Sequence, residues 1–302
     1  MNKRNDFICI GAVHYDYILR LKQNYFKNRT NPINQQKNLG GVAYNIANIL
    51  SFLNQNVKLY SLNCNPFQKK EIRECGIKFK SLSNSIQNRY YTSVLDKNGK
   101  MVFGLANMDN YEKMIDSKFL KDHINKKIIL DLNLSSVSIK KIIDINYKKN
   151  YICVCGTSAH KVYKIKNLLN KIDTIILNKQ ESFTLTNTKE IKDSMNYLKN
   201  KNKNLNIIIT NGKNAVNACI NNVDYIAYPP ITKINNENGA GDALSAIFNF
   251  FFHSIDELGS LNKSICAGSL KASGYKNDKE KYLKKIDRLS KLIKFKIIKK
   301  YE

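Results

Sequence analysis

Several common features are missing from this 302-residue chain, and each absence makes one class of protein unexpected. No run of about 18 apolar residues occurs, so no membrane-spanning helix is expected. The seven cysteines form no C-x-x-C pair, and the four histidines are scattered without metal-ligand spacing. We therefore expect free thiols in a reducing cytoplasm rather than a disulfide framework or a metal motif. Internal repeats and low-complexity linkers are also absent.

Arginine is scarce as well, which bears on the large positive charge of the chain. The net charge is +26, but the cations are 44 Lys and only 6 Arg, spread along the whole sequence. Proteins that recognise DNA bases favour the arginine fork, and their basic residues cluster. We interpret the charge as a compositional bias toward Lys, Asn and Ile, and we do not expect a nucleic-acid partner. Binding of nucleic acid through phosphate contacts stays open as the alternative.

The chain does contain an alternation of strand-like and helix-like segments, which is typical of an α/β domain. Short apolar runs followed by polar or helical sequence predict parallel strands with crossover helices. These strands are expected at 7–13, 127–132, 151–155, 174–177 and 206–210. Helices are expected at 42–53, 243–252 and 264–273, with a basic amphipathic helix at 279–300. We interpret 7–13 as a buried strand and not as a secretory signal.

A hairpin is predicted in the first half of the chain. Two strand-like segments, 89–95 and 101–106, flank a turn with the sequence Asn98-Gly99, which is a strong hairpin signal. The segments near 14–38 and 88–108 are expected to form a small β lid. No domain boundary is visible, so residues 1–302 are expected to form one domain.

The sharpest local signal is the sequence Asn238-Gly239-Ala240-Gly241-Asp242, directly before an apolar helix. Its two glycines let the backbone turn tightly, so that amides at the helix start can converge on an anion. A carboxylate weakens such a site unless it acts as a general base, which explains Asp242. The plain alternative is an acidic residue in a first helical turn, where acidic residues are favoured. We prefer the catalytic interpretation, because chance produces this string in only about one such chain in a hundred.

A second signal is the glycine pair Gly40-Gly41, followed by Asn45 in a predicted helix. Glycines before a helix let a ligand approach the backbone, and an asparagine offers both a donor and an acceptor to sugar hydroxyls. By itself the pattern is explained equally well by an ordinary turn from loop to helix.

These motifs come in the order found in the ribokinase-like (PfkB) carbohydrate kinases, which the chain resembles from about residue 7 to about residue 274. The matching residues are Gly11 and Asp16, Gly40-Gly41 with Asn45, Asn178 to Glu181, Thr210 to Gly212, and Gly239 to Asp242. The resemblance implies a doubly wound, mostly parallel α/β sheet with a small β lid. It also implies a kinase that uses ATP and Mg²⁺.

The resemblance implies a role for each matching residue. Those that would bind sugar hydroxyls are Asp16, Gly40, Gly41 and Asn45. The anion hole would be formed by Gly239, Ala240 and Gly241, with Asp242 as the base. Asn178 and Glu181, in an NxxE motif, would help to place Mg²⁺ and the phosphates, Glu181 acting indirectly on the metal. The residues beside the nucleotide would be Thr210, Gly212 and Asn238.

Within this family the chain is most similar to the pseudouridine kinases. The stretches that carry this similarity are Thr30-Asn31-Pro32, GGVAYNIANIL, YYTSVLDKNGKMV, Asn107-Met108-Asp109 and the segment from Asp131 to Ser135. The similarity implies phosphorylation of pseudouridine, a small-molecule substrate, with Asn31, Asn107, Asp109, Asp131 and Asn133 on the substrate side. A homodimer is compatible with it. The alternatives are another sugar or nucleoside kinase, for ribose or of the adenosine type, and a non-catalytic relative that binds nucleosides or nucleic acid.

The chain also departs from the family pattern in three places. The stretch 54–76 is short and lacks the usual Gly-Asp and Phe-Gly residues, which predicts a trimmed layer. Ala215 stands where the family usually has a second glycine. Asn236 and Glu237 stand where Asp-Thr usually precedes the anion hole, which argues against the monovalent-cation site of many relatives.

Overall fold

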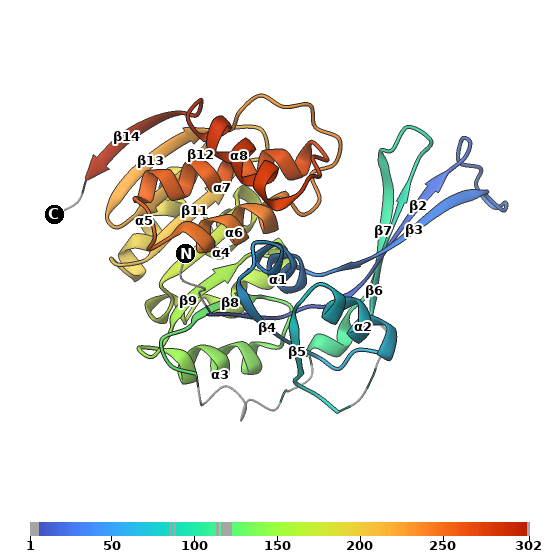
Figure 1. Ribbon diagram of the computed structural model, residues 1–302, viewed down its shortest axis with the longest axis horizontal. Coiled ribbons are helices and arrows are strands. Elements are labelled where there is room, and N and C mark those ends of the chain that lie inside the picture. Colours follow the sequence, from blue (N-terminus) through green and yellow to red (C-terminus); the bar gives the residue numbers. More distant parts are fainter. Residues whose placement is uncertain (1–5, 85, 87–88, 113–114, 116–122, 301–302) are drawn as a thin grey trace.

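The computed structural model of the chain describes residues 6–84, 86, 89–112, 115 and 123–300. Its larger sheet has ten strands in the order β14-β13-β12-β11-β10-β9-β8-β1-β4-β5 (Figure 1). The seven strands β11-β10-β9-β8-β1-β4-β5 pair in parallel. Strands β12, β13 and β14 extend the sheet beyond β11 in antiparallel pairs. The strands are β1 (Asp6–Ile10), β4 (Asn56–Ser61), β5 (Lys78–Ser81), β8 (Lys127–Asp131), β9 (Tyr151–Cys155), β10 (Thr174–Asn178), β11 (Asn206–Thr210), β12 (Val216–Ile220), β13 (Val223–Tyr228) and β14 (Lys294–Lys300).

Helices cover both faces of this sheet, because its central strands are apolar on both sides. In β1, Phe7 and Cys9 belong to one buried cluster, whereas Ile8 and Ile10 belong to the other. The first cluster includes residues of α1 (Val42–Phe52), α2 (Pro66–Glu74), α6 (Ala240–Phe251), α7 (Glu257–Ala272) and α8 (Lys279–Ser290). The second includes residues of α3 (Ser136–Asn146), α4 (Lys179–Thr186), α5 (Ile191–Lys201) and the 3₁₀ segments η1 (Asp109–Glu112), η3 (Ala159–Ile165) and η4 (Leu169–Lys171). The expected doubly wound, mostly parallel α/β fold is confirmed.

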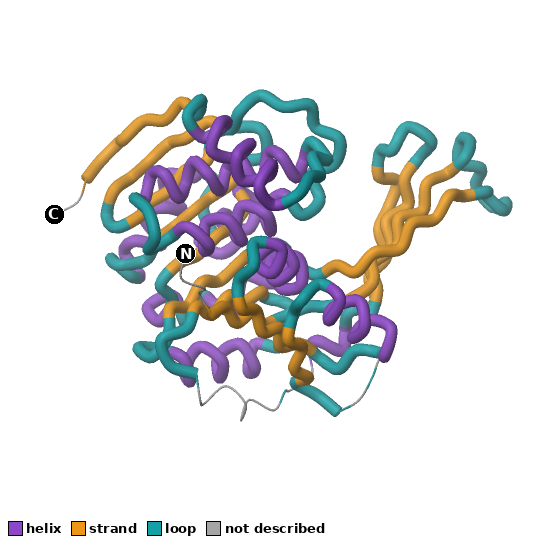
Figure 2. Tube along the Cα trace, viewed as in Figure 1, coloured by secondary structure: helices purple, strands orange, loops and turns teal. Residues whose placement is uncertain are grey.

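A second sheet of four strands projects from this body (Figures 1 and 2). Its order is β3-β2-β6-β7, with strands β2 (His14–Leu21), β3 (Ile33–Gly40), β6 (Tyr90–Leu95) and β7 (Met101–Asn107). The hairpin turn expected at Asn98-Gly99 joins β6 to β7, and Asp96 Oδ1 accepts the N–H groups of Asn98 and Lys100. These strands fall in the two segments expected to form a lid, and "lid" is used below for this sheet.

Two of the sequence predictions need correction. The helix expected at 279–300 ends at Ser290, and 294–300 is the edge strand β14 paired with β13. The apolar spacing of this segment is helical, but an open edge of the sheet offers backbone partners that a local pattern does not reveal. The helix expected from 264 begins at Glu257, because Asp256 caps it by accepting the Gly259 N–H.

Other expectations concern the short stretch 54–76 and the cysteines. The stretch still supplies the strand β4 and the nine-residue helix α2, whose Ile72 is buried. All seven cysteines are free, and only Cys75 is not fully buried. None of the helices in the described part of the chain is long and apolar enough to cross a membrane.

Candidate active site

The glycine-rich motif forms the start of α6. Gly239 is the N-cap residue, with a φ of 77° in the left-handed region that favours glycine. No side chain from the described residues caps this helix. The Ala240 N–H is donated to the Glu237 carbonyl, so Ala240 is not an open donor of the expected anion hole. Within the described chain, the amides of Gly241 and Asp242 have no backbone acceptor and are the donors that an anion would meet.

Asp242 lies in the first turn of α6 and is held by α1. Asn45 Nδ2 donates a hydrogen bond of 2.7 Å to Asp242 Oδ2. Burial raises the pKa of Asp242 to about 6, and the negative charges of Asp131 and Asp16 act in the same direction. The hydrogen bond from Asn45 and the positive charge of Lys271 partly oppose this rise. A carboxylate with a pKa near neutrality is suited to accept a proton at physiological pH.

The lid contributes Asp16 to the same site. Asp16 Oδ1 is 3.0 Å from His14 Nε2, two residues earlier on the same face of β2. A Cβ atom on Gly40 would collide with Asp16 Oδ2, so the glycine is needed for the carboxylate to lie there. Sequence analysis did not single out His14, although its i, i+2 spacing from Asp16 in a predicted strand was a usable signal.

Cross-strand register defines the two faces of the lid. Asp16 pairs with Asn38 of β3 and with Tyr91 of β6, and paired residues share a face. We call this the inner face, because the negative charge of Asp16 raises the pKa of Asp242, which means that Asp16 is on the side of the sheet near Asp242. Tyr15 and Tyr17 alternate with Asp16 along β2 and therefore lie on the outer face.

Asp131 and Asn133 are buried behind the site. Asp131 is 1% exposed, and its Oδ2 accepts the N–H groups of Ala12 (2.8 Å) and Ala43 (3.1 Å). Its Oδ1 accepts the Asn133 N–H at 2.9 Å, and Asn133 Oδ1 accepts from Lys161 Nζ at 2.7 Å. Asp131 thus links the end of β1 to the start of α1. Both of its oxygens accept backbone N–H groups, so Asp131 positions the backbone and is not the direct substrate ligand that was expected.

A large cavity of about 500 Å³ opens beside the start of α6. It brings together Asn178, Thr210 and Gly212 with Ala240 and Gly241. Its apolar wall includes Val216, Pro229, Pro230, Ile231, Leu244 and Ile265. Such a volume suits a ligand of nucleotide size, and apolar walls with a few polar groups are usual for small-molecule sites. Sequence analysis did not predict the part of the wall that follows β13, because the loop Pro229-Pro230-Ile231 matches no functional motif. Asn238 does not line the cavity; its N–H is donated to Asn236 Oδ1.

The NxxE motif forms a capping box at the start of α4. Asn178 Oδ1 accepts the Glu181 N–H at 2.9 Å, and Glu181 Oε2 accepts the Asn178 N–H at 2.8 Å. Glu181 is 4% exposed. Burial raises its pKa to about 7, the Asn178 N–H opposes the rise, and the charge of Asp242 adds to it.

The described residues include no group of three or more His, Cys, Asp and Glu side chains able to hold a metal ion. Magnesium usually keeps several waters and binds one or two carboxylates together with substrate phosphates. Glu181 fits such an arrangement through a water molecule, since one of its oxygens is occupied by the Asn178 N–H.

Two residues expected on the substrate side, Asn31 and Asn107, lie away from Asp16, and a third, Asp109, is at the protein surface. Asn31 is in the tip of the lid, where its side chain bonds to Phe26 and Arg29 of its own loop. Asn107 pairs with Tyr90, whose ring contacts that of Tyr17, so Asn107 is on the outer face. Asp109 is exposed at the start of η1.

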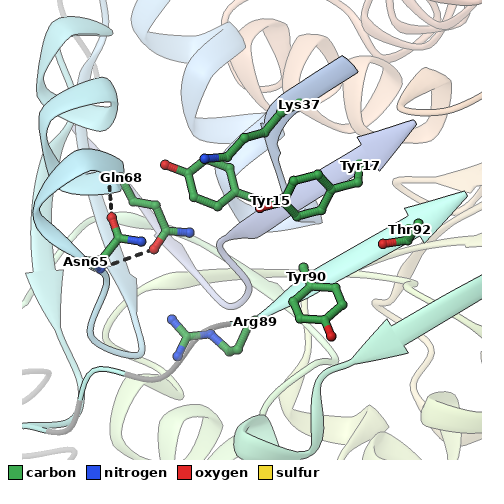
Figure 3. Close-up of a pocket in the computed structure, with 8 residues that line it drawn as sticks. All are labelled: Tyr15, Tyr17, Lys37, Asn65, Gln68, Arg89, Tyr90 and Thr92. Carbon is green, nitrogen blue, oxygen red and sulfur yellow. Dashed lines mark hydrogen bonds between the residues drawn. The ribbon is translucent and has the colours of Figure 1, made fainter. Parts of the chain in front are cut away.

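The outer face of the lid has a groove of its own, with a volume of about 420 Å³ (Figure 3). Tyr15, Tyr17 and Tyr90 from the lid face Asn65 and Gln68 of the α2 capping box across it. Lys37 Nζ lies 3.6 Å from the centre of the Tyr15 ring, and Tyr15 donates a 3.0 Å hydrogen bond to Glu71 of α2. This groove is separated from Asp16 by the thickness of the sheet and is not part of the site around Asp242.

Comparison with known proteins gives one family match and many similar structures. The model of the pfkB family of carbohydrate kinases matches residues 4–270. A carbohydrate kinase from Agrobacterium tumefaciens superimposes with a TM-score of 0.80 at 19% identity, covering 97% of this chain and 100% of that chain. A ribokinase from Thermotoga maritima has a TM-score of 0.77 at 12% identity, covering 96% and 100%. A ribokinase from Cryptococcus neoformans var. grubii serotype A in complex with ADP has a TM-score of 0.70 at 14% identity, covering 94% and 100%. No curated protein matches the chain at a significant level.

Proposed function

Since the chain belongs to the pfkB family of carbohydrate kinases, we propose that it transfers the γ-phosphoryl group of ATP to the 5′-hydroxyl of pseudouridine. The observation that carries the proposal is the position of Asp242. It lies in the first turn of α6, which no side chain of the described residues caps, and it accepts a hydrogen bond from Asn45, which follows the Gly40-Gly41 pair. Its neighbour Gly241 lines the large cavity. Asp242 therefore stands between a sugar side and a nucleotide side.

In the reaction, Asp242 accepts the proton of the attacking hydroxyl as the hydroxyl oxygen bonds to the γ-phosphorus. The bond from that phosphorus to the β,γ-bridging oxygen breaks, and ADP leaves. The amides of Gly241 and Asp242 donate to the phosphoryl oxygens, where negative charge develops. Magnesium, brought with the nucleotide, would neutralise phosphate charge, and Glu181 would hold it through water. No covalent protein intermediate is required.

On the nucleotide side, the apolar wall of the large cavity would contact the adenine base. The described lining includes Thr210, Asn178 and Gly212, which provide polar groups beside that wall. On the sugar side, Asp16 and Asn45 would bond to ribose hydroxyls. These assignments follow the family resemblance residue by residue, and the proximity of Asp16, Asn45 and Asp242 supports them.

Two observations favour a nucleoside over a free sugar. The resemblance to pseudouridine kinases includes the hairpin of β6 and β7, and Tyr91 of this hairpin pairs with Asp16 on the inner face. The inner face of the lid also carries Tyr91 and Asn38 next to Asp16. A tyrosine ring offers a stacking surface to a base, and an asparagine amide can bond to its edge. Ribose is the second candidate, because ribokinases are among the similar structures.

The experiment is a comparison of kcat/KM for pseudouridine, uridine, adenosine and ribose at saturating Mg-ATP. Pseudouridine should be preferred, because its extra ring N–H can pair with an acceptor on the inner face of the lid, such as the Asn38 amide oxygen, which uridine would leave unpaired. Polar discrimination of that kind reaches about 10⁴–10⁵, whereas shape alone gives roughly 10–200-fold. An Asp242→Asn preparation controls for contaminating kinases. Equal values for uridine and pseudouridine, or a preference for ribose, would overturn the substrate and leave the kinase assignment in place.

A further inference from the structure

Lys271 lies in the last turn of α7, next to the start of α6. A Cβ atom on Gly239 would be 3.0 Å from Lys271 Cε and 3.9 Å from its Nζ. The same point is 3.9 Å from Asp242 Oδ2. The lysine stem thus passes close to Gly239, and its ammonium acts on the charge of Asp242 without forming an ion pair with it.

Glycine at position 268 explains why α7 comes so close to α6. A Cβ atom there would be 3.1 Å from the carbonyl oxygen of Ala240, so only a glycine fits comfortably. Lys271 follows Gly268 by one helical turn and is carried to Gly239 by this contact. On the same helix, Ile265, Gly268, Ser269 and Ala272 line the large cavity. Lys271 does not line the cavity itself, but it lies on the helix that does and acts on the charge of Asp242.

Lys271 is exposed, and charges of both signs lie near its ammonium. A lysine in the last turn of its own helix is favoured by the helix dipole. The start of α6, however, carries partial positive charge, which repels an ammonium. No carboxylate in the described chain lies within ion-pair distance of Lys271 Nζ. An anion bound by the amides of Gly241 and Asp242 would meet the full positive charge of Lys271 as well.

We propose that Lys271 is a catalytic residue whose ammonium contacts the transferring phosphoryl group at the start of α6. The inference rests on phosphoryl transfer, the core of the proposed function, and not on which acceptor is used. The ammonium stabilises the negative charge that spreads over the phosphoryl oxygens as the group passes from ADP to the acceptor oxygen. The amides of Gly241 and Asp242 supply neutral donors, and Lys271 supplies the full positive charge.

The test compares Lys271→Met with Lys271→Arg and with Lys276→Met as a control. Lys276 is an exposed lysine just beyond α7, so its replacement removes one nearby charge without touching the site. Loss of one such donor should lower kcat by roughly 10²–10³-fold for Lys271→Met. Lys271→Arg should retain much of the rate, and Lys276→Met should match the wild type. A Lys271→Met enzyme with more than half the wild-type kcat would overturn the proposal.

A pH profile separates a phosphoryl contact from a packing role. Asp242 is faced by Asp16 of β2, Asn45 of α1, Asp131 of β8, Cys155 of β9, Glu181 of α4 and Lys271 of α7. Only the lysine adds positive charge, which holds the pKa of Asp242 down. The acidic limb of kcat/KM should therefore move to higher pH in Lys271→Met and stay in place in Lys271→Arg. An unmoved limb in both variants would count against the lysine.

Binding of a phosphoryl mimic tests the lysine independently of any acceptor. ADP with aluminium fluoride should bind the wild type more tightly than Lys271→Met, by about 10-fold or more, whereas ADP alone should bind both similarly. If the wild type phosphorylates none of the four acceptors, the proposed substrate fails and this comparison still decides the role of Lys271. Equal affinity of the wild type and Lys271→Met for ADP with aluminium fluoride would overturn the proposed role of Lys271.

Discussion

Replacing Asp242 by asparagine should abolish most of the activity and at the same time stabilise the protein. The folded-state pKa of Asp242 is raised from 3.8 to about 6, mainly by burial. A carboxyl group with a raised pKa does not destabilise the folded state below about pH 4, because it is then protonated in both the folded and the unfolded state. The cost appears as the pH rises from about 4 to 6 and is complete above 6, because ionisation is then harder in the folded state than in the unfolded state.

The magnitude follows from the size of that shift. About two pKa units correspond to an upper limit of about 3 kcal/mol at pH 8, which partial exposure of the side chain reduces. For a chain of this length, such a gain raises Tm by about 3–5 °C. Asparagine has nearly the same shape and its amide oxygen can still accept from Asn45, so the packing should survive. The loss of a general base should lower kcat by roughly 10²–10⁴-fold.

The assay is thermal unfolding of wild type and Asp242→Asn at pH 4.5, 6 and 8, with kcat measured on the same preparations. The difference in Tm should grow with pH. Asp193→Asn is a matched control, because Asp193 is an exposed carboxylate in the first turn of α5. Removing it should cost about 0.3–1 kcal/mol through the helix dipole, with kcat unchanged. An Asp242→Asn protein that is less stable at pH 8, or that keeps half its turnover, would refute the reasoning.

Two further predictions concern the sugar side and the loop before α6. Asp16→Ala and Asn45→Ala should each weaken acceptor binding by about 1–3 kcal/mol and leave ATP affinity nearly unchanged, as measured by calorimetry; unchanged acceptor binding in both variants would mean that the sugar pocket lies elsewhere. Potassium in place of a bulky organic cation, at fixed ionic strength, should leave kcat nearly unchanged. A potassium ion needs oxygen ligands, but the Ala272 carbonyl oxygen accepts the N–H groups of Asn235 and Asn236, and Asn236 Oδ1 accepts the Asn238 N–H. A large potassium-dependent rise in kcat would contradict this prediction.

Much of the fold and part of the site could be predicted from sequence alone. The central strands are short apolar runs with polar or helical sequence between them, and this pattern is visible without coordinates. The motif at Gly239 to Asp242 is equally local, since a left-handed glycine at a helix start depends on a few neighbouring residues. The same holds for the capping box of Asn178 and Glu181, which an N-x-x-E pattern before a helix indicates.

What the sequence could not provide are relations between residues far apart in the chain. The register of β2 with β6 and of β6 with β7 puts Asn107 on the face opposite to Asp16, and the Asn31 side chain bonds within the turn at the lid tip. Strand β14 exists because β13 offers an open edge, although the local spacing is helical.

The chemistry of the site likewise depends on tertiary structure. Sequence alone predicted Asp242 as the candidate base, but its pKa depends on burial and on the charges of residues in β2, β8 and α7. Lys271 lies near Gly239 because α7 packs closely on α6 at Gly268. A motif reports the backbone conformation of a few consecutive residues, whereas burial, like charges and helix contacts are properties of the folded chain. Those properties decide whether the carboxylate can act as a base and where positive charge lies beside it.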